Sequence, residues 1–363
     1  MEGGTIIITG ANGSLAIHAI SHILSKSPKT TLILTVRNTS NSDPNTNTLR
    51  ETITRFPDTT VSIRPLDLSH LQSVSDFCSK LSAEIREGKI PPIRGIVANA
   101  FHWNLVSPAE VTGDNLEKTM QVNHISHASL VLRLLASFDP EAGGRVVLFT
   151  SDAHFPGRNG LERYPAAILD DIDELVRVGA WPGSGNRDRD GYGDGNGLGS
   201  NDDDKEKDYQ GRGMQRYANS KLVVLMWAYA LNRRLEKSQN PTLNNIAAIA
   251  IDPGNLTDSR ALRTNTPAML TYMQRLVLQP LRPVLRLIAP DLRRASEAGV
   301  DVAELVLDRK EKYRGVKGYL RLMVEGPSSD ESLDEMKQEA LWDKTLEWAR
   351  VGKKETVLLE DGI

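Results

Sequence analysis

The stretch TIIITGANGSLA, residues 5–16, decides the fold. Its first five residues form a β-branched run, and the glycine turn after them leads directly into the helical pattern of residues 14–26. Gly10 and Gly13 in a tight strand-to-helix turn let backbone amides and the helix N-terminus approach a pyrophosphate. Ala16 stands where a third glycine commonly packs helix on strand. The stretch predicts a dinucleotide-binding unit, and an ordinary turn is the alternative.

Short, nearly continuous apolar runs recur along the chain and alternate with helical patterns. Such runs are typical of strands buried on both faces of a parallel sheet. The expected strands are 5–9, 31–36, 61–66, 95–100, 145–150 and 246–251, and the expected helices are 14–26, 70–85, 115–138 and 220–237. The alternation predicts an α/β protein, a single Rossmann-type domain over 1–363 with a doubly wound parallel sheet and right-handed crossovers.

Two regions depart from this rhythm. Residues 155–213 form an insertion, and its Gly- and Asp-rich part, 182–213, contains too few aliphatic side chains to bury a core, so we expect it to be disordered. Residues 258–315 are expected to form a substrate lid, followed by a last strand within 318–324 and an amphipathic helix within 331–351. Lids of this kind vary substrate choice on a constant scaffold.

Composition narrows the class of partner. The 363 residues carry a net charge of -3, which offers no field for nucleic acid and favours a small-molecule substrate. Cys78 is the only cysteine, so an internal disulfide is excluded and a thiolate zinc site is implausible. The histidine pairs His18/His22 and His124/His127 are interpreted as helix-surface residues, and no metal is expected. With neither a basic leader nor a long apolar run at the N-terminus, we expect a cytoplasmic protein.

The most apolar later stretch is AMLTYMQRLVLQPLRPVLRLIAP, residues 268–290. Arginines and prolines interrupt it, so it is not expected to span a bilayer. We interpret it as two short helices over a pocket, whose apolar side chains Met269, Leu270, Met273, Leu276 and Leu278 suggest a lipophilic substrate. The alternative, an amphipathic surface that docks on a membrane, stays open.

Two further features indicate chemistry. Tyr217 and Lys221 share one helix face, where an ammonium can stabilise a phenolate and so make the tyrosine a usable acid or base. Arg37 ends the second strand with no acid beside it, and an arginine there can pair with a 2′-phosphate, which predicts NADP rather than NAD. Read singly, each is also explained by ordinary surface residues.

Seven motifs follow one another on the expected elements: TGANGSLA at 9–16, LDLS at 66–69, ANA at 98–100, VNHISH at 122–127, Ser151 after a strand, YANSK at 217–221 and DPG at 252–254. In this order they resemble the short-chain dehydrogenase/reductase family over nearly the whole chain. The resemblance implies an NADP(H)-dependent oxidoreductase that interconverts a ketone and a secondary alcohol. The alternative is a cofactor-fold protein with a non-redox role, isomerase-like or regulatory.

The resemblance also assigns roles. Tyr217 matches the general acid or base, Ser151 the residue that orients the carbonyl, and Lys221 the residue that bonds the nicotinamide ribose and lowers the tyrosine pKa. Asn123 matches the asparagine that holds a proton-relay water. The implied cofactor contacts are Gly10, Asn12, Gly13, Ser14, Leu15, Arg37, Asp67, Leu68, Asn99, Ala100, Asn123, Tyr217, Lys221, Pro253, Gly254 and Thr257. Family members often oligomerise through helices matching 109–138 and 214–237, which leaves a homo-oligomer open.

Three features depart from the family pattern. Ser151 and Tyr217 are 66 residues apart, where the family commonly has about a dozen, so the insertion must loop out for them to meet. The glycine rhythm is that of the extended branch of the family, whereas the catalytic motifs are of the classical branch. Phe101, His102 and Trp103 follow Asn99 and Ala100 where the family usually has a glycine, which places bulky rings near the nicotinamide pocket.

Overall fold

The computed structural model describes residues 3–178, 208–307 and 315–359. Its main sheet has the strand order β10-β9-β6-β5-β4-β1-β2-β3, parallel throughout except for the β9–β10 hairpin. The strands are β1 Thr5–Thr9, β2 Thr31–Val36, β3 Val61–Pro65, β4 Ile93–Ala98, β5 Gly144–Phe149, β6 Ile246–Asp252, β9 Gly318–Arg321 and β10 Val324–Glu325. The order reverses between β1 and β4, and β1 pairs with both β2 and β4. This is the predicted doubly wound Rossmann architecture.

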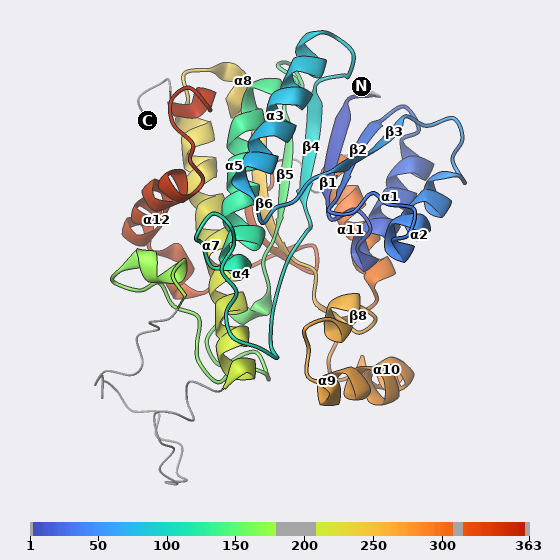
Figure 1. Ribbon diagram of the computed structural model, residues 1–363, viewed down its shortest axis with the longest axis vertical. Coiled ribbons are helices and arrows are strands. Elements are labelled where there is room, and N and C mark those ends of the chain that lie inside the picture. The colour runs from blue at the N-terminus through green and yellow to red at the C-terminus, as the bar shows by residue number, and fades with distance from the viewer. Residues whose placement is uncertain (1–2, 179–207, 308–314, 360–363) are drawn as a thin grey trace.

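Helices cover both faces of the sheet (Figure 1). One face is covered by α1 Ser14–Lys26, α2 Pro44–Ile53 and α11 Ala295–Leu307, and the other by α3 Leu71–Arg86, α5 Ser126–Leu134 and α7 Tyr209–Lys237. The helix α12 Glu335–Trp348 packs on α7. Short elements complete the chain: α4 Lys118–Met120, a π-helical turn Gln121–Ile125, α8 Pro241–Asn244, the small sheet β7 Asn255–Leu256 with β8 Leu292–Arg293, α9 Ala268–Met273, a π-helical turn Gln274–Leu278 and α10 Gln279–Leu285. The 3₁₀ turns are Leu135–Ser137, Asp152–His154, Ile172–Leu175, Arg260–Arg263, Asp330–Leu333 and Val357–Leu359.

Alternating side chains of the strands feed two apolar cores. Ile7, Ile33 and Ile96 face α3, α5 and α7, whereas their neighbours Ile6, Leu32 and Val97 face α1 and α11. The third strand differs from expectation, because β3 lies at the sheet edge and its residues are half-exposed rather than buried on both faces. The helix starts follow local chemistry: the Asp43 carboxylate accepts a hydrogen bond from Thr46 N, and Pro44 occupies the first turn of α2.

The expected insertion and lid are only partly as predicted. The helix α7 begins at Tyr209, so residues 209–213 of the segment expected to be disordered are helical, and residues 179–207 lie outside the described part. Within the expected lid, α11 packs against α1 with Gly299 close to Leu15 O, so it belongs to the sheet layer. The pair α9 and α10 forms as expected, but Pro283 lies inside α10 without ending it.

Candidate active site

The predicted acid–base pair lies on α7 at the carboxyl ends of the strands. Tyr217 and Lys221 are one turn apart, and Lys221 Nζ is 5.3 Å from the centroid of the Tyr217 ring. Ser151, which follows β5, lies near enough to Tyr217 for its hydroxyl to lower the pKa of the phenol. The 66 residues between serine and tyrosine therefore do not prevent the meeting that the sequence predicts.

Ser151 is held by the first turn after β5. Its Oγ accepts a hydrogen bond from Ala153 N at 3.3 Å and donates one to Asp152 Oδ1 at 3.0 Å. The residue is thus the N-cap of the 3₁₀ turn Asp152–His154. This turn fixes the hydroxyl close to the phenol of Tyr217.

Burial dominates the electrostatics of the pair. It raises the pKa of Tyr217 above its usual value, and the nearby Ser151 hydroxyl only partly opposes this. Burial lowers the pKa of Lys221 to about 7, and its Nζ donates to Phe149 O at 3.0 Å. The net direction for Tyr217 is opposite to the predicted one, because burial of the phenol itself outweighs the effect of Ser151.

Asn123 lies in a π-helical turn, Gln121–Ile125, that joins α4 to α5. Its side-chain oxygen accepts from His102 N at 2.7 Å, while Nδ2 donates to His102 O at 3.0 Å and to Ser220 Oγ at 2.9 Å. Both backbone groups of His102 are therefore held by one amide. Such π-helical turns are frequent at functional sites. The predicted relay residue thus fixes the chain that carries Phe101 and Trp103.

Two aromatic rings flank the tyrosine. The Trp103 ring meets Tyr217 edge-on at 5.5 Å, and the Phe101 ring lies 6.2 Å away on a side chain that is 43% exposed. Trp103 Nε1 donates to Ala261 O and Thr264 O, which ties it to the start of the lid region. The rings that the sequence places near the nicotinamide pocket are thus beside the catalytic pair.

The glycine loop is built for close approach. Gly10 has a φ of +59°, and a Cβ there would lie 2.9 Å from Ala100 Cα, so a larger residue is excluded. Asn99 Nδ2 donates to Thr9 O and Gly10 O, which pins the loop to the end of β4. Gly13 is the N-cap of α1, and Ser14 and Leu15 begin that helix. This arrangement leaves the α1 N-terminus free of side-chain caps.

The remaining predicted cofactor residues surround this loop. Arg37 is exposed at the end of β2, and Asp67 follows β3 with its carboxylate accepting from Ser69 N and Ser69 Oγ. Burial alone would raise the pKa of Asp67, but the hydrogen bonds from Ser69 leave it lowered. Leu68 is buried in the core.

Beyond β6 the chain turns toward the lid. Gly254 has a φ of +82° and follows Pro253 in the turn after β6. Thr257 is buried, and its hydroxyl donates to Arg293 O. It therefore serves the β7–β8 sheet.

The comparisons with known proteins agree with this architecture. A family model described as the KR domain matches residues 4–177, and one described as the AcuH dehydrogenase domain matches residues 260–358. The chain is 27% identical to the short-chain dehydrogenase iccH of Talaromyces variabilis over 98% of both chains. It is 45% identical to the dehydrogenase acuH of Aspergillus aculeatus, over 26% of this chain and 94% of that protein.

This chain belongs to the short-chain dehydrogenase/reductase family. The fold agrees: a crystal structure of NADPH-bound carbonyl reductase from chicken fatty liver superposes with a TM-score of 0.55 at 13% identity, covering 90% of this chain and 100% of that one. The protein is accordingly an oxidoreductase of a family that uses nicotinamide cofactors.

Sequence reasoning missed a polar cluster behind Ser151. His154, Tyr319 and Asp252 are each at most 4% exposed, and His154 Nε2, Tyr319 Oη and Asp252 Oδ2 make no hydrogen bond within the described residues. Asp252 Oδ2 lies 3.3 Å from Arg321 Nε. Because Tyr319 and Arg321 come from β9, no motif near Ser151 signals them.

Arg260 was also missed. Its NH2 donates to Asn12 O and its backbone N to Ser14 Oγ, so it lies against the glycine loop. Asn12 Nδ2 in turn donates to Asp43 Oδ2. The only signal in the sequence is an arginine shortly after DPG, which is too common to single out.

One of the two histidine pairs differs from expectation, whereas His18 is exposed on α1 as predicted. His124 and His127 are buried, not on a helix surface: His124 contacts Thr345 Oγ1 and His127 Nε2 contacts Thr9 Oγ1, both at 2.9 Å. The amphipathic pattern misleads because α12 and β1 cover that side of the helix. His22 pairs with Glu304. Among the described residues, no three His, Cys, Asp or Glu side chains gather as a metal site.

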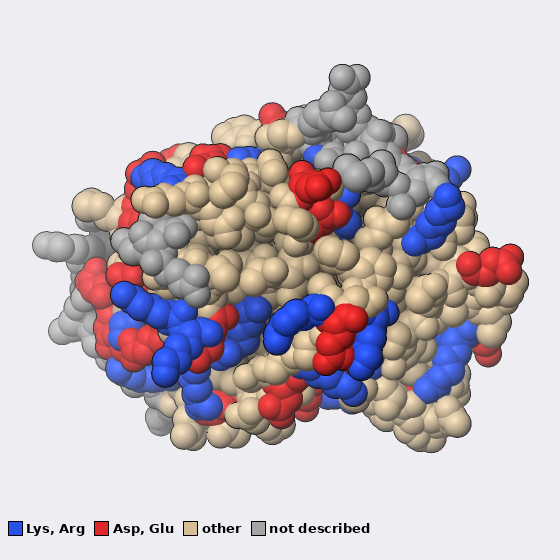
Figure 2. Space-filling view, turned by 90° about the horizontal axis from the view of Figure 1, so that it is seen from above, with Lys and Arg blue, Asp and Glu red and all other residues tan. Residues whose placement is uncertain are grey.

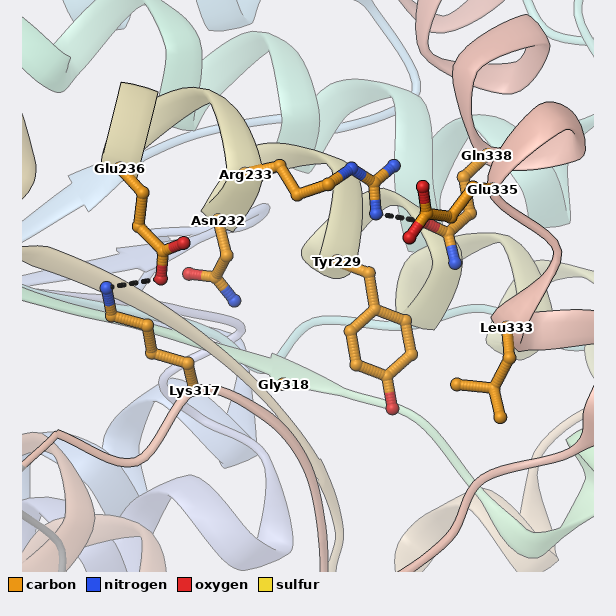
Figure 3. A pocket seen from close by; sticks show the side chains of 9 residues that line it. All are labelled: Tyr229, Asn232, Arg233, Glu236, Lys317, Gly318, Leu333, Glu335 and Gln338. Carbon is orange, nitrogen blue, oxygen red and sulfur yellow. Dashed lines mark hydrogen bonds and ion pairs between the residues drawn. The ribbon is translucent and has the colours of Figure 1, made fainter. Parts of the chain in front are cut away.

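A separate pocket of about 260 Å³ lies between α7, β9 and α12 (Figure 3). Its lining residues are Tyr229, Asn232, Arg233, Glu236, Lys317, Gly318, Leu333, Glu335 and Gln338. Tyr229 is twelve residues beyond Tyr217 on α7, about 18 Å along the helix axis. The pocket is thus remote from the catalytic pair.

Proposed function

We propose that this protein interconverts a ketone and a secondary alcohol on a lipophilic small molecule, using NADP(H), with Tyr217 as the general acid or base. The observation that carries the proposal is that Ser151, Tyr217 and Lys221 gather at the carboxyl ends of the strands, where the Gly10 turn also lies. Phe101 and Trp103 supply apolar walls for the substrate.

The residues at the sheet edge fit a dinucleotide. The uncapped N-terminus of α1, which follows the Gly10 turn, suits a pyrophosphate. Arg37 is the exposed cation for a 2′-phosphate. Asp43, the nearest acid after β2, is engaged as the α2 N-cap, since Thr46 N and Thr46 Oγ1 donate to it. A bound nicotinamide would supply or accept the hydride.

Each catalytic side chain then has one task. In reduction, Ser151 donates a hydrogen bond to the carbonyl oxygen, and the Tyr217 hydroxyl transfers its proton to the alkoxide that forms there. Lys221, the nearest cation, stabilises the resulting phenolate. Asn123 holds the His102 backbone, which keeps the aromatic walls in place.

Tyr217→Phe tests the chemistry. We expect turnover to fall by about a hundredfold or more while NADPH affinity stays within about twofold, because only the transferable proton is removed. Stopped-flow absorbance at the NADPH band on a panel of lipophilic ketones measures the first, and fluorescence titration measures the second. Turnover equal to wild type would refute the role of Tyr217.

Arg37→Ala tests the cofactor. NADPH affinity is expected to fall by about tenfold with NADH affinity unchanged, since one charge-assisted contact to a phosphate is lost. Arg55→Ala, at an exposed arginine that follows α2, is the matched control and should leave both affinities unchanged. Equal wild-type affinity for the two cofactors would contradict the NADP assignment.

One observation favours the non-redox alternative. The Phe101 ring lies 5.5 Å from Lys221 Nζ and close to Tyr217, where it narrows the space for a nicotinamide ring. If this ring excludes the cofactor, neither NADPH nor NADH binds to the wild type, and Phe101→Gly restores binding. Tight NADPH binding by the wild type would dismiss this alternative.

A further inference from the structure

The segment formed by α9, the π-helical turn Gln274–Leu278 and α10 differs from an ordinary surface helix, which turns its apolar face inward. Its inward side chains are polar: Gln274 is fully buried and donates to Thr257 O and Ser259 O, and Arg282 is buried with its guanidinium on Glu297. Most of the apolar side chains face outward, whereas Leu270 packs against the core and Leu278 is half-buried. This differs from the expectation that they line a pocket.

The outward side chains form one continuous stripe. They recur every three or four residues, the spacing of a single helix face, and are between 40% and 84% exposed. This lid stripe consists of Met269, Tyr272, Met273, Leu276, Val277, Leu281, Val284, Leu287 and Ile288. Exposed apolar patches of this extent mark interaction surfaces. In Figure 1, α9 and α10 project from the end of the molecule opposite the N-terminus, so no other described element covers them.

The charge around the stripe has one sign. Residues 260–290 contain five arginines and no acidic residue, although the whole chain is slightly acidic. Arg263 and Arg275 are exposed and form no ion pair with any described residue. By contrast, the face seen from above in Figure 2 intersperses basic and acidic side chains. The lid therefore combines an apolar stripe with unneutralised positive charge.

We propose that the lid stripe docks this protein on an anionic lipid surface. Apolar side chains insert at the level of the acyl boundary, and Arg263 and Arg275 lie among the anionic headgroups, as in an interfacial amphipathic helix. Among the described residues, no helix is long and apolar enough to cross a bilayer, so the contact is peripheral.

A second copy of the chain fits the stripe less well. Two-fold pairing of identical surfaces would bring together two copies of Arg263 and Arg275, which form no ion pair with a described residue, and residues 260–290 supply no acidic partner for them. Anionic headgroups provide the missing charge. The observations therefore favour lipid over self-association.

The same lid touches the catalytic end of the molecule. Thr264 O and Ala261 O accept hydrogen bonds from Trp103 Nε1, and Trp103 packs against Tyr217. A lipophilic substrate dissolved in the membrane would thus enter beside the catalytic tyrosine. This consequence, unlike the docking itself, rests on the proposed function.

Vesicle co-sedimentation tests the docking. The full chain is mixed with vesicles of phosphatidylcholine containing about 30 mol% phosphatidylserine, and with pure phosphatidylcholine vesicles. Binding to the anionic vesicles is expected to be at least about fivefold stronger and to weaken with salt. In Leu276→Glu/Leu287→Glu, partitioning should fall at least about tenfold, because two inserting side chains become charged.

Matched variants separate the causes. Met336→Glu, on an equally exposed apolar residue of α12, should bind as wild type. Arg263→Gln/Arg275→Gln should lose the preference for anionic vesicles. Thermal unfolding and NADPH titration verify that each variant is folded. The assay needs no turnover, so a catalytically silent protein that still binds vesicles refutes the proposed function alone.

Three results would overturn the docking proposal. The first is a wild type that does not sediment with anionic vesicles. The second is a Leu276→Glu/Leu287→Glu variant that binds them as well as wild type. The third is a wild-type dimer in light scattering that this variant converts to a monomer, which would assign the stripe to self-association.

Discussion

At the scale of single residues, the carboxylate of Asp252, which lies behind Ser151, holds its proton more firmly than usual. Burial raises the pKa of Asp252 to about 6, aided by Asp152 and Asp291 and opposed by Gly254 N and Arg321. Between about pH 4 and pH 6 the folded chain therefore binds a proton that the unfolded chain has lost. The folded state loses stability from this group as pH rises through that window.

Asp252→Asn should reverse this penalty. The free energy of unfolding of the variant, measured relative to wild type, should be about 1–3 kcal/mol higher at pH 7.5 than at pH 4. Loss of the ion pair with Arg321 reduces this gain. Urea denaturation of both proteins at the two pH values measures the difference. Asp58→Asn, on an exposed loop, is the control. If the difference in unfolding free energy between variant and wild type were the same at both pH values, it would contradict the raised pKa of Asp252.

Residue-scale prediction works where the chemistry is local. Gly10, Asn99 and Ser151 were predicted from short motifs, and their contacts join loops that adjoin in any sheet of this type. Tyr319 was not predicted. It lies beside His154 only because β9 pairs with β6, and it is more than 160 residues from His154 in the sequence. Its hydroxyl carries no local signal.

At the scale of secondary-structure elements, α12 closes the outer side of α7. Trp342 is 1% exposed and stacks on Trp227 at 6.0 Å with an interplanar angle of 11°, while the Arg234 guanidinium lies 4.2 Å over its ring. His124, at the start of the α5 region, contacts Thr345 of the same helix. The helices through which relatives often oligomerise are thus covered by this chain's own C-terminal segment.

Trp342→Ala should cost about 3–5 kcal/mol of unfolding free energy, the usual loss when a large buried aromatic is truncated. Urea denaturation followed by circular dichroism gives the value. Met336→Ala on the exposed side of α12 should change it by less than about 0.5 kcal/mol. A loss below about 1 kcal/mol for Trp342→Ala would mean that α12 is not part of the cooperative core.

Secondary-structure elements were predictable where a single apolar pattern in the sequence determined them. Strands such as β1, β2 and β6 match their apolar runs to within a residue, because both faces are buried. The sequence analysis placed α11 in the lid. The small residues of this helix indicate close packing only once the structure shows Gly299 against α1. The orientation of α9 and α10 could not be predicted, because periodicity gives the apolar face of a helix but not the side to which it turns.

At the scale of the whole molecule, four histidines are held neutral away from water. Burial lowers the pKa to about 4 for His102, His127 and His154, and to about 3 for His124. They belong to separate elements, from the end of β4 to the 3₁₀ turn after β5. In the unfolded chain each would titrate near its usual value of 6.5.

This set makes the fold sensitive to acid. Stability from these histidines is complete above about pH 6.5 and is lost as pH falls toward 4, because unfolding lets each bind a proton. With Asp252 acting in the opposite sense, unfolding near pH 5 should take up about three protons, a slope of about 4 kcal/mol per pH unit.

Urea midpoints measured from pH 7 to pH 5 should therefore fall steeply. His124→Gln should remove about one proton from the uptake. A midpoint independent of pH over this range would show that these histidines are charged, or already solvated, in the folded protein.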